Sequence, residues 1–201
     1  NTYGTASDRA LLLDYQATLE PKTEKAIKLE KEALAQIKET TKKNAHLVSN
    51  LHSNLGGLYR INGQLNLAKK HMEMGISLLE QYQLLYTNDS IPQINNYAVL
   101  LTEIQEPDLA LSALQKLAQI IKEYNSNHCL DYAQVQESLG SICLITANIS
   151  QAKTHFKKAL KIYEDIWADE PELIEEKYKK IQELYPQAGI ALAKSILPTK
   201  H

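Results

Sequence analysis

The sequence has little glycine and proline, with 7 and 6 residues of these types among 201. That is about half, or less, of the average usage in soluble proteins. Architectures rich in strands need many turns, and glycine and proline supply a large share of them. The scarcity therefore disfavours a β-sandwich or a barrel, and no alternating apolar run is long enough to predict a strand.

Long apolar runs, a cysteine framework and an excess of charge are also absent. The longest pure apolar runs have four or five residues, as at residues 98–101, whereas a membrane span needs about 18. Two cysteines, Cys129 and Cys143, do not make a disulfide framework. A net charge of -2 gives no basic footprint for nucleic acid or an anionic membrane. We therefore expect no membrane partner and no direct contact with nucleic acid, and a cytoplasmic location, because no export signal is visible.

The motifs that mark common active sites are missing as well. The sequence contains no His-Glu-x-x-His, no Cys-x-x-Cys, no glycine-rich phosphate loop and no Gly-x-Ser-x-Gly. The acidic pair Glu175 and Glu176 is typical of a solvated helix face. We therefore predict no catalytic residue, no metal ligand and no cofactor, and a protein that is not an enzyme.

What the sequence does contain is a repeat of 42 residues. One column of the repeat holds only alanine, at Ala26, Ala68, Ala110 and Ala152. The position four residues later is mostly large and apolar, and is filled by Glu30, Met72, Leu114 and Phe156. The position twelve residues before the alanine is mostly small, and is filled by Asp14, Gly56, Ala98 and Gly140. Apolar steps of three and four residues are the helical period, and small residues mark places where two helices approach closely.

Each unit is therefore predicted to be a helical hairpin. The expected repeats cover about residues 5–44, 45–88, 89–128 and 129–170, with turns at Asn62-Gly63 and around Pro107. The register fades after about residue 170. We expect residues 171–197 to form atypical helices that cap the last repeat, with a link to a further domain as the alternative.

The second unit carries the signature of a known repeat at Leu55, Gly56, Tyr59, Gly63, Ala68, Met72 and Gly75. This pattern resembles the tetratricopeptide repeat. The first unit departs from it, because Asp14 stands where a small residue belongs. The period is longer than the usual 34 or so residues, which is similar to the repeats of kinesin light chains and many bacterial regulators. The resemblance implies an all-α fold, a right-handed superhelical solenoid of about four antiparallel helix hairpins.

A polar stripe on the first helices is the expected binding site, because first helices line the concave surface in that family. Its residues are Asn50, Ser53, Asn54 and Arg60 in the second unit, Asn95, Asn96 and Thr102 in the third, and Gln134, Glu137 and Ser138 in the fourth. Side-chain amides both donate and accept hydrogen bonds, which suits capture of a peptide backbone. The alternative is that Asn54, Asn96 and Ser138 only link adjacent helices.

Two functions are compatible with this sequence. The first is a protein-protein interaction scaffold that binds a peptide or a partner protein in its groove, as a module of a larger protein. The second is a ligand-sensing domain, such as that of a bacterial peptide-pheromone receptor or a signal-transduction ATPase. The sequence identifies neither the partner nor the oligomeric state.

Overall fold

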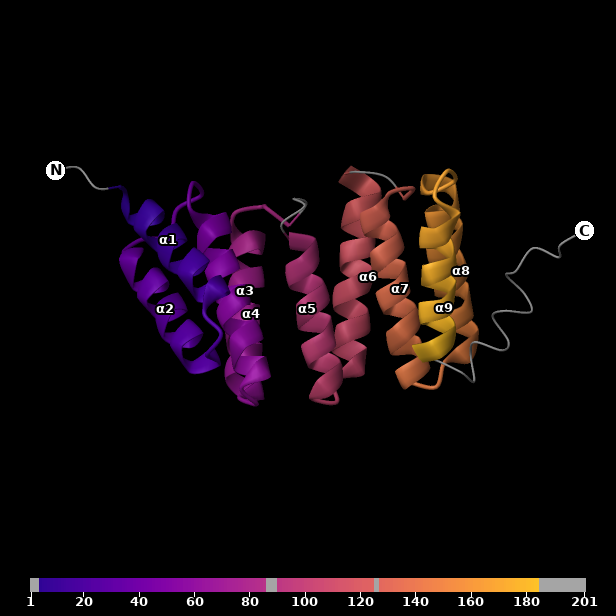
Figure 1. The fold of residues 1–201 in the computed structure, drawn as a ribbon, viewed down its shortest axis with the longest axis horizontal. Coiled ribbons are helices and arrows are strands. Elements are labelled where there is room, and N and C mark those ends of the chain that lie inside the picture. Colours follow the sequence, from indigo (N-terminus) through magenta and orange to yellow (C-terminus); the bar gives the residue numbers. More distant parts are fainter. Residues whose placement is uncertain (1–3, 86–89, 125–126, 185–201) are drawn as a thin grey trace, which may run out of the picture. The chain divides into compact units, whose positions relative to one another are not determined.

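The computed structural model describes residues 4–85, 90–124 and 127–184, and within these ranges all regular structure is α-helical. The helices are α1 (Ala6–Leu19), α2 (Thr23–Gln36), α3 (Ala45–Ile61), α4 (Leu65–Gln81), α5 (Ser90–Glu103), α6 (Pro107–Tyr124), α7 (Leu130–Ile145), α8 (Ile149–Ile166) and α9 (Pro171–Leu184), as Figure 1 shows. The expected all-α fold is confirmed. No helix of the described ranges is long and apolar enough to cross a membrane.

The 42-residue period of the sequence reappears in the helix boundaries. The second helix of each expected hairpin begins one period after the previous one, at Thr23, Leu65, Pro107 and Ile149. The alanine of each of these helices is buried, with at most 1% of its surface exposed. The repeat in the sequence is therefore a repeat of helix positions and of core positions.

Close packing inside a hairpin explains the column of small residues. A Cβ atom built on Gly56 of α3 would lie 2.6 Å from Cγ of Met72 on α4. A Cβ atom on Gly140 of α7 would lie 2.8 Å from the ring of Phe156 on α8. Both distances are shorter than a real contact, so the small residue is what lets the large apolar one fill the core.

The chain divides into two compact units, Asn1–Glu106 and Pro107–His201. In the first unit α1 packs against α2 and α3 against α4, while α2 also contacts α3 and α4 contacts α5. In the second unit α7 contacts both α6 and α8, and α9 packs on α8. The division falls between α5 and α6, inside the third expected repeat, so the four repeat boundaries stay predictions. Helix α9 forms where a terminal helix was expected, and the rest of that expected end, residues 185–197, lies outside the described residues.

Candidate functional site

The first hairpin lacks the contact between a small residue and a large apolar residue that Gly56 makes with Met72 and Gly140 makes with Phe156. Glu30 of α2 stands in the column of Met72 and is 1% exposed. Its carboxyl group lies within interaction distance of the carboxyl group of Asp14 of α1, which stands in the column of Gly56. A pair of carboxyl groups therefore replaces the contact between a small residue and a large apolar one.

Burial decides the charge of this pair. Loss of hydration, followed by the interaction with the carboxyl group of Asp14 and its negative charge, raises the pKa of Glu30 to about 9. The carboxyl group of Glu30 therefore keeps its proton at neutral pH. Its Oε2 atom is buried and has no hydrogen-bond partner among the described residues. Asn54 of α3 donates to Oδ1 of Asp14 over 2.8 Å, which ties α3 to α1.

A hollow of about 240 Å³ lies against Glu30, the buried member of this carboxyl pair. It is lined by Ala17, Thr18, Glu30, Ser53, Asn54, Gly57, Leu58, Ile61 and Asn96. Ala17, Glu30 and Ser53 are its buried members, whereas Thr18, Asn54, Ile61 and Asn96 are exposed. The structure therefore brings together three residues of the expected stripe, Ser53, Asn54 and Asn96, at one opening of the first unit.

Two other residues of the stripe serve as links between helices. Gln93 of α5 donates to Oδ1 of Asn50 over 2.6 Å, and its Oε1 lies 2.7 Å from the hydroxyl of Ser49. Arg60 of α3 forms two hydrogen bonds to the carboxylate of Glu103 on α5, at 2.8 and 2.6 Å. The same guanidinium lowers the pKa of Glu103 below its usual value. Asn50 and Arg60 thus connect α3 to α5.

The two remaining stripe residues of α5 lie outside the hollow. Thr102 donates its hydroxyl to the backbone oxygen of Ala98 within the same helix. Oδ1 of Asn95 is buried and has no hydrogen-bond partner among the described residues.

The stripe residues of α7 belong to the second unit and are not part of the hollow. Glu137 accepts hydrogen bonds from the hydroxyl of Tyr163 and from Nζ of Lys177, each at 2.9 Å. Lys180 lies 3.7 Å from the other oxygen of Glu137. Glu137 therefore fixes α9 and α8 to α7. Gln134 is exposed and Ser138 is half-buried.

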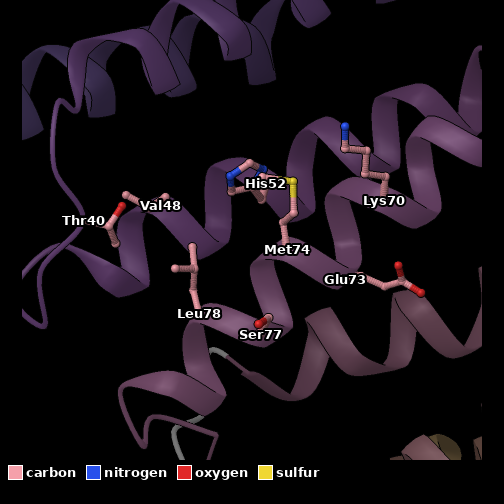
Figure 2. A pocket seen from close by; sticks show the side chains of 8 residues that line it. All are labelled: Thr40, Val48, His52, Lys70, Glu73, Met74, Ser77 and Leu78. Carbon is pink, nitrogen blue, oxygen red and sulfur yellow. The ribbon is translucent and has the colours of Figure 1, made fainter.

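A second hollow, of about 500 Å³, lies elsewhere on α3 and α4. Figure 2 shows its lining, with Thr40 at one end and Lys70 and Glu73 at the other. His52 lines it, and Nδ1 of His52 lies 2.9 Å from Nδ1 of His71. Burial, and then the neighbouring His71, lowers the pKa of His52 to about 4. Both rings are therefore neutral near pH 7, with one nitrogen donating and the other accepting.

Sequence reasoning missed both the histidine pair and the role of Glu30. The repeat pattern of the sequence contained a signal for the histidine pair and another for Glu30. Gln136 and His155 stand two periods after His52 and His71, and they are hydrogen-bonded at 2.8 Å in the same way. Glu30 was the only charged residue in an otherwise apolar column. In the described ranges, no three His, Cys, Asp or Glu residues lie close enough to hold a metal ion.

Comparison with known proteins identifies the repeat. Residues 90–165 match the family model of the tetratricopeptide repeat. No curated protein matches the chain. Among solved structures, BtubC (BKLC) from P. vanneervenii is similar with a TM-score of 0.75 at 16% identity, over 94% of this chain and 77% of that chain.

Two further solved structures are similar. A Podosopora anserina protein described as a kinesin light chain with nearly identical TPR-like repeats has a TM-score of 0.68 at 12% identity, over 81% of this chain and 76% of that chain. The Rap conjugation gene regulator of plasmid pLS20, solved with a Phr peptide, has a TM-score of 0.54 at 11% identity, over 94% of this chain and 53% of that chain. At these identities the likeness shows the fold alone.

Such repeats typically serve as non-catalytic scaffolds for protein interactions. The helix order, the buried repeat columns and the family match agree with one another. Residues 90–165 therefore carry tetratricopeptide-repeat sequence, and the fold of the chain is that of solenoid structures built from such helical hairpins.

Proposed function

We propose that the chain is a protein-interaction scaffold that binds a peptide segment of a partner protein on the exposed face of α1, α3 and α5. The observation that carries this proposal is the hollow at Ser53, Asn54 and Asn96. Its rim offers amide and hydroxyl groups, which can bond a peptide backbone, beside the apolar side chains of Leu58 and Ile61.

The proposal assigns different roles to the stripe residues. Asn96 and Ser53 contact the peptide directly, whereas Asn50 and Arg60 hold α3 against α5 so that the rim keeps its shape. In the second unit by itself, the stripe residues Gln134 and Ser138 are proposed as contacts for a partner of that unit. Glu137 serves to anchor α9.

Selection from a peptide library on the immobilised chain tests the proposal. The selected peptide is then measured against Asn96→Ala and against Asn66→Ala, which removes an amide of the same size from the exposed surface of α4. We expect Asn96→Ala to weaken binding about fivefold or more, the value of one or two hydrogen bonds. Equal affinity of the two variants would contradict the assignment of this face.

A second function, a ligand-sensing regulatory domain, is favoured by one observation. The fold resembles that of the Rap regulator solved with a peptide. In that case peptide binding changes the arrangement of the helices and drives an attached output domain of a bacterial receptor or ATPase. Small-angle scattering with and without the selected peptide distinguishes the two functions, because a sensor changes its scattering profile on binding and a rigid scaffold does not. A cytoplasmic location is part of both proposals.

A further inference from the structure

The carboxyl pair of the first hairpin is not needed to build a hairpin of this fold. The second hairpin fills the same two positions with Gly56 and Met72, and the fourth fills them with Gly140 and Phe156. Burying Glu30 in their place is unfavourable, because a buried carboxyl group loses hydration. A departure from a local packing rule is expected at a functional site.

The pair has more acceptor atoms than donors around it. Glu30 and Asp14 share one donor side chain, that of Asn54. The Oε2 atom of Glu30 is buried, unpartnered and part of a residue that lines the hollow. The lining contains no lysine, arginine or histidine. The site therefore lacks the positive hydrogen-bond donor that two adjacent carboxyl groups would bind most strongly.

The dimensions of the hollow suit one side chain. Its volume of about 240 Å³ is below the roughly 300–1,000 Å³ of sites for drug-sized ligands. Leu58 and Ile61 provide apolar surface for an aliphatic stem, and the buried carboxyl group of Glu30 is part of the same lining. An apolar stem that ends in a positive group is the description of an arginine or lysine side chain.

We propose that this hollow is a subsite for a basic side chain of the bound peptide, with the positive group paired to the carboxyl groups of Glu30 and Asp14. Arginine is the better fit, because its planar guanidinium can bond two carboxyl groups at once. On binding, the proton of Glu30 is released to solvent and the cation takes its place. This inference rests on the proposed function, since it names the residue type that the peptide-binding face selects.

A single-residue probe tests the subsite without any knowledge of the partner. N-acetyl-arginine methylamide is titrated into the ¹⁵N-labelled chain, and the side-chain amide signals of Asn54 and Asn96 are followed by NMR. A probe of this size in a fitting site binds with a Kd on the order of 1 mM. The matched control probe is the citrulline analogue, which has nearly the shape of arginine without its charge. We expect saturable shifts with arginine and at least about tenfold weaker binding of citrulline.

Two variants assign the effect to the carboxyl pair. Glu30→Gln removes the acid while keeping the shape, and Glu32→Gln removes an exposed acid of the same helix. Arginine affinity is expected to fall at least about tenfold in the first variant and to stay unchanged in the second. Asp14→Asn provides a second test at the other carboxyl group, with the same expected loss.

The outcomes separate this inference from the proposed function. Equal binding of arginine and citrulline, or no binding of arginine at millimolar concentration, would overturn the basic-side-chain subsite. A library peptide that depends on Asn96 but not on Glu30 would also overturn the subsite while leaving the peptide-binding face intact. A library peptide that loses affinity both in Glu30→Gln and on arginine-to-citrulline exchange supports the subsite.

Discussion

Glu30 lies against Asp14 at the place where Met72 lies against Gly56 in the next hairpin. The same two helix positions therefore hold an apolar contact in one repeat and a pair of carboxyl groups in its neighbour. A hollow lined by Glu30 adjoins this pair, and we propose that it binds a side chain of a partner.

Removing the acid at position 30 is expected to stabilise the protein at neutral and alkaline pH. The pKa of Glu30 is about 9 in the folded chain, above its ordinary value of 4.5. The unfolded chain releases this proton first, so stability falls as pH rises from 4.5 to 9, by about 1.4 kcal/mol per pH unit. We expect Glu30→Gln to lack this decline and to gain about 3 kcal/mol at pH 7. Urea denaturation of both proteins at pH 5, 7 and 8.5 measures the difference, and parallel pH profiles would contradict the assignment.

The histidine pair on α3 and α4 is expected to act in the opposite direction. The pKa of His52 is about 4 when folded, below its ordinary value of 6.5. The unfolded chain takes up this proton first, so the contribution present above pH 6.5 is lost as pH falls toward 4. His52→Gln copies the pair formed by Gln136 and His155, so it should retain more stability at pH 4.5 relative to pH 7 than the native chain. Thermal melts of both proteins at the two pH values test this. The prediction is wrong if the loss of stability between pH 7 and pH 4.5 is the same in the variant and the native chain.

Substitution by alanine is expected to change stability in opposite directions at two helical glycines, Gly140 and Gly57. A Cβ atom on Gly140 would lie 2.8–2.9 Å from the ring of Phe156, so Gly140→Ala should destabilise by about 1–3 kcal/mol. A Cβ atom on Gly57 meets nothing within 4 Å. Gly57→Ala should therefore stabilise by up to about 1 kcal/mol through helix propensity. Denaturant midpoints of the two variants check the pair, and destabilisation of both would contradict the open space beside Gly57.

The anchoring of α9 is expected to depend on one carboxylate. Glu137→Gln removes the charge that Lys177 and Lys180 bind. We expect amide hydrogen exchange in residues 171–184 to accelerate at least about tenfold, while exchange in α1–α4 stays the same. Glu176→Gln, an exposed change on α9 itself, is the matched control. Equal exchange in the two variants would show that the ion pairs of Glu137 do not hold this helix.

The repeat in the sequence predicted the helix positions well, for a physical reason. Each second helix begins one period after the last, since the same alanine must be buried against the same kind of neighbour. The repeat pattern assigns one face of each first helix to packing against its partner helix, so the opposite face is left for a ligand. That is why Ser53, Asn54 and Asn96 were predicted as site residues. The partners of Arg60 and Glu137 were not predictable in this way, because they depend on side-chain conformations and on α9, which lies outside the repeat. Glu30 was visible as an exception in its column, but the column alone did not show that a hollow adjoins it.

The most direct test of the proposed binding face is to fill the hollow without disturbing the fold. Gly57→Leu adds a side chain at an open position of α3, and Asn66→Leu adds the same side chain on the exposed surface of α4. The measurement is the affinity of a library-selected peptide for each variant, with urea denaturation to confirm that both are folded. We expect Gly57→Leu to reduce the affinity at least about tenfold and Asn66→Leu to leave it unchanged. An unchanged affinity for the folded Gly57→Leu variant would contradict binding at this hollow.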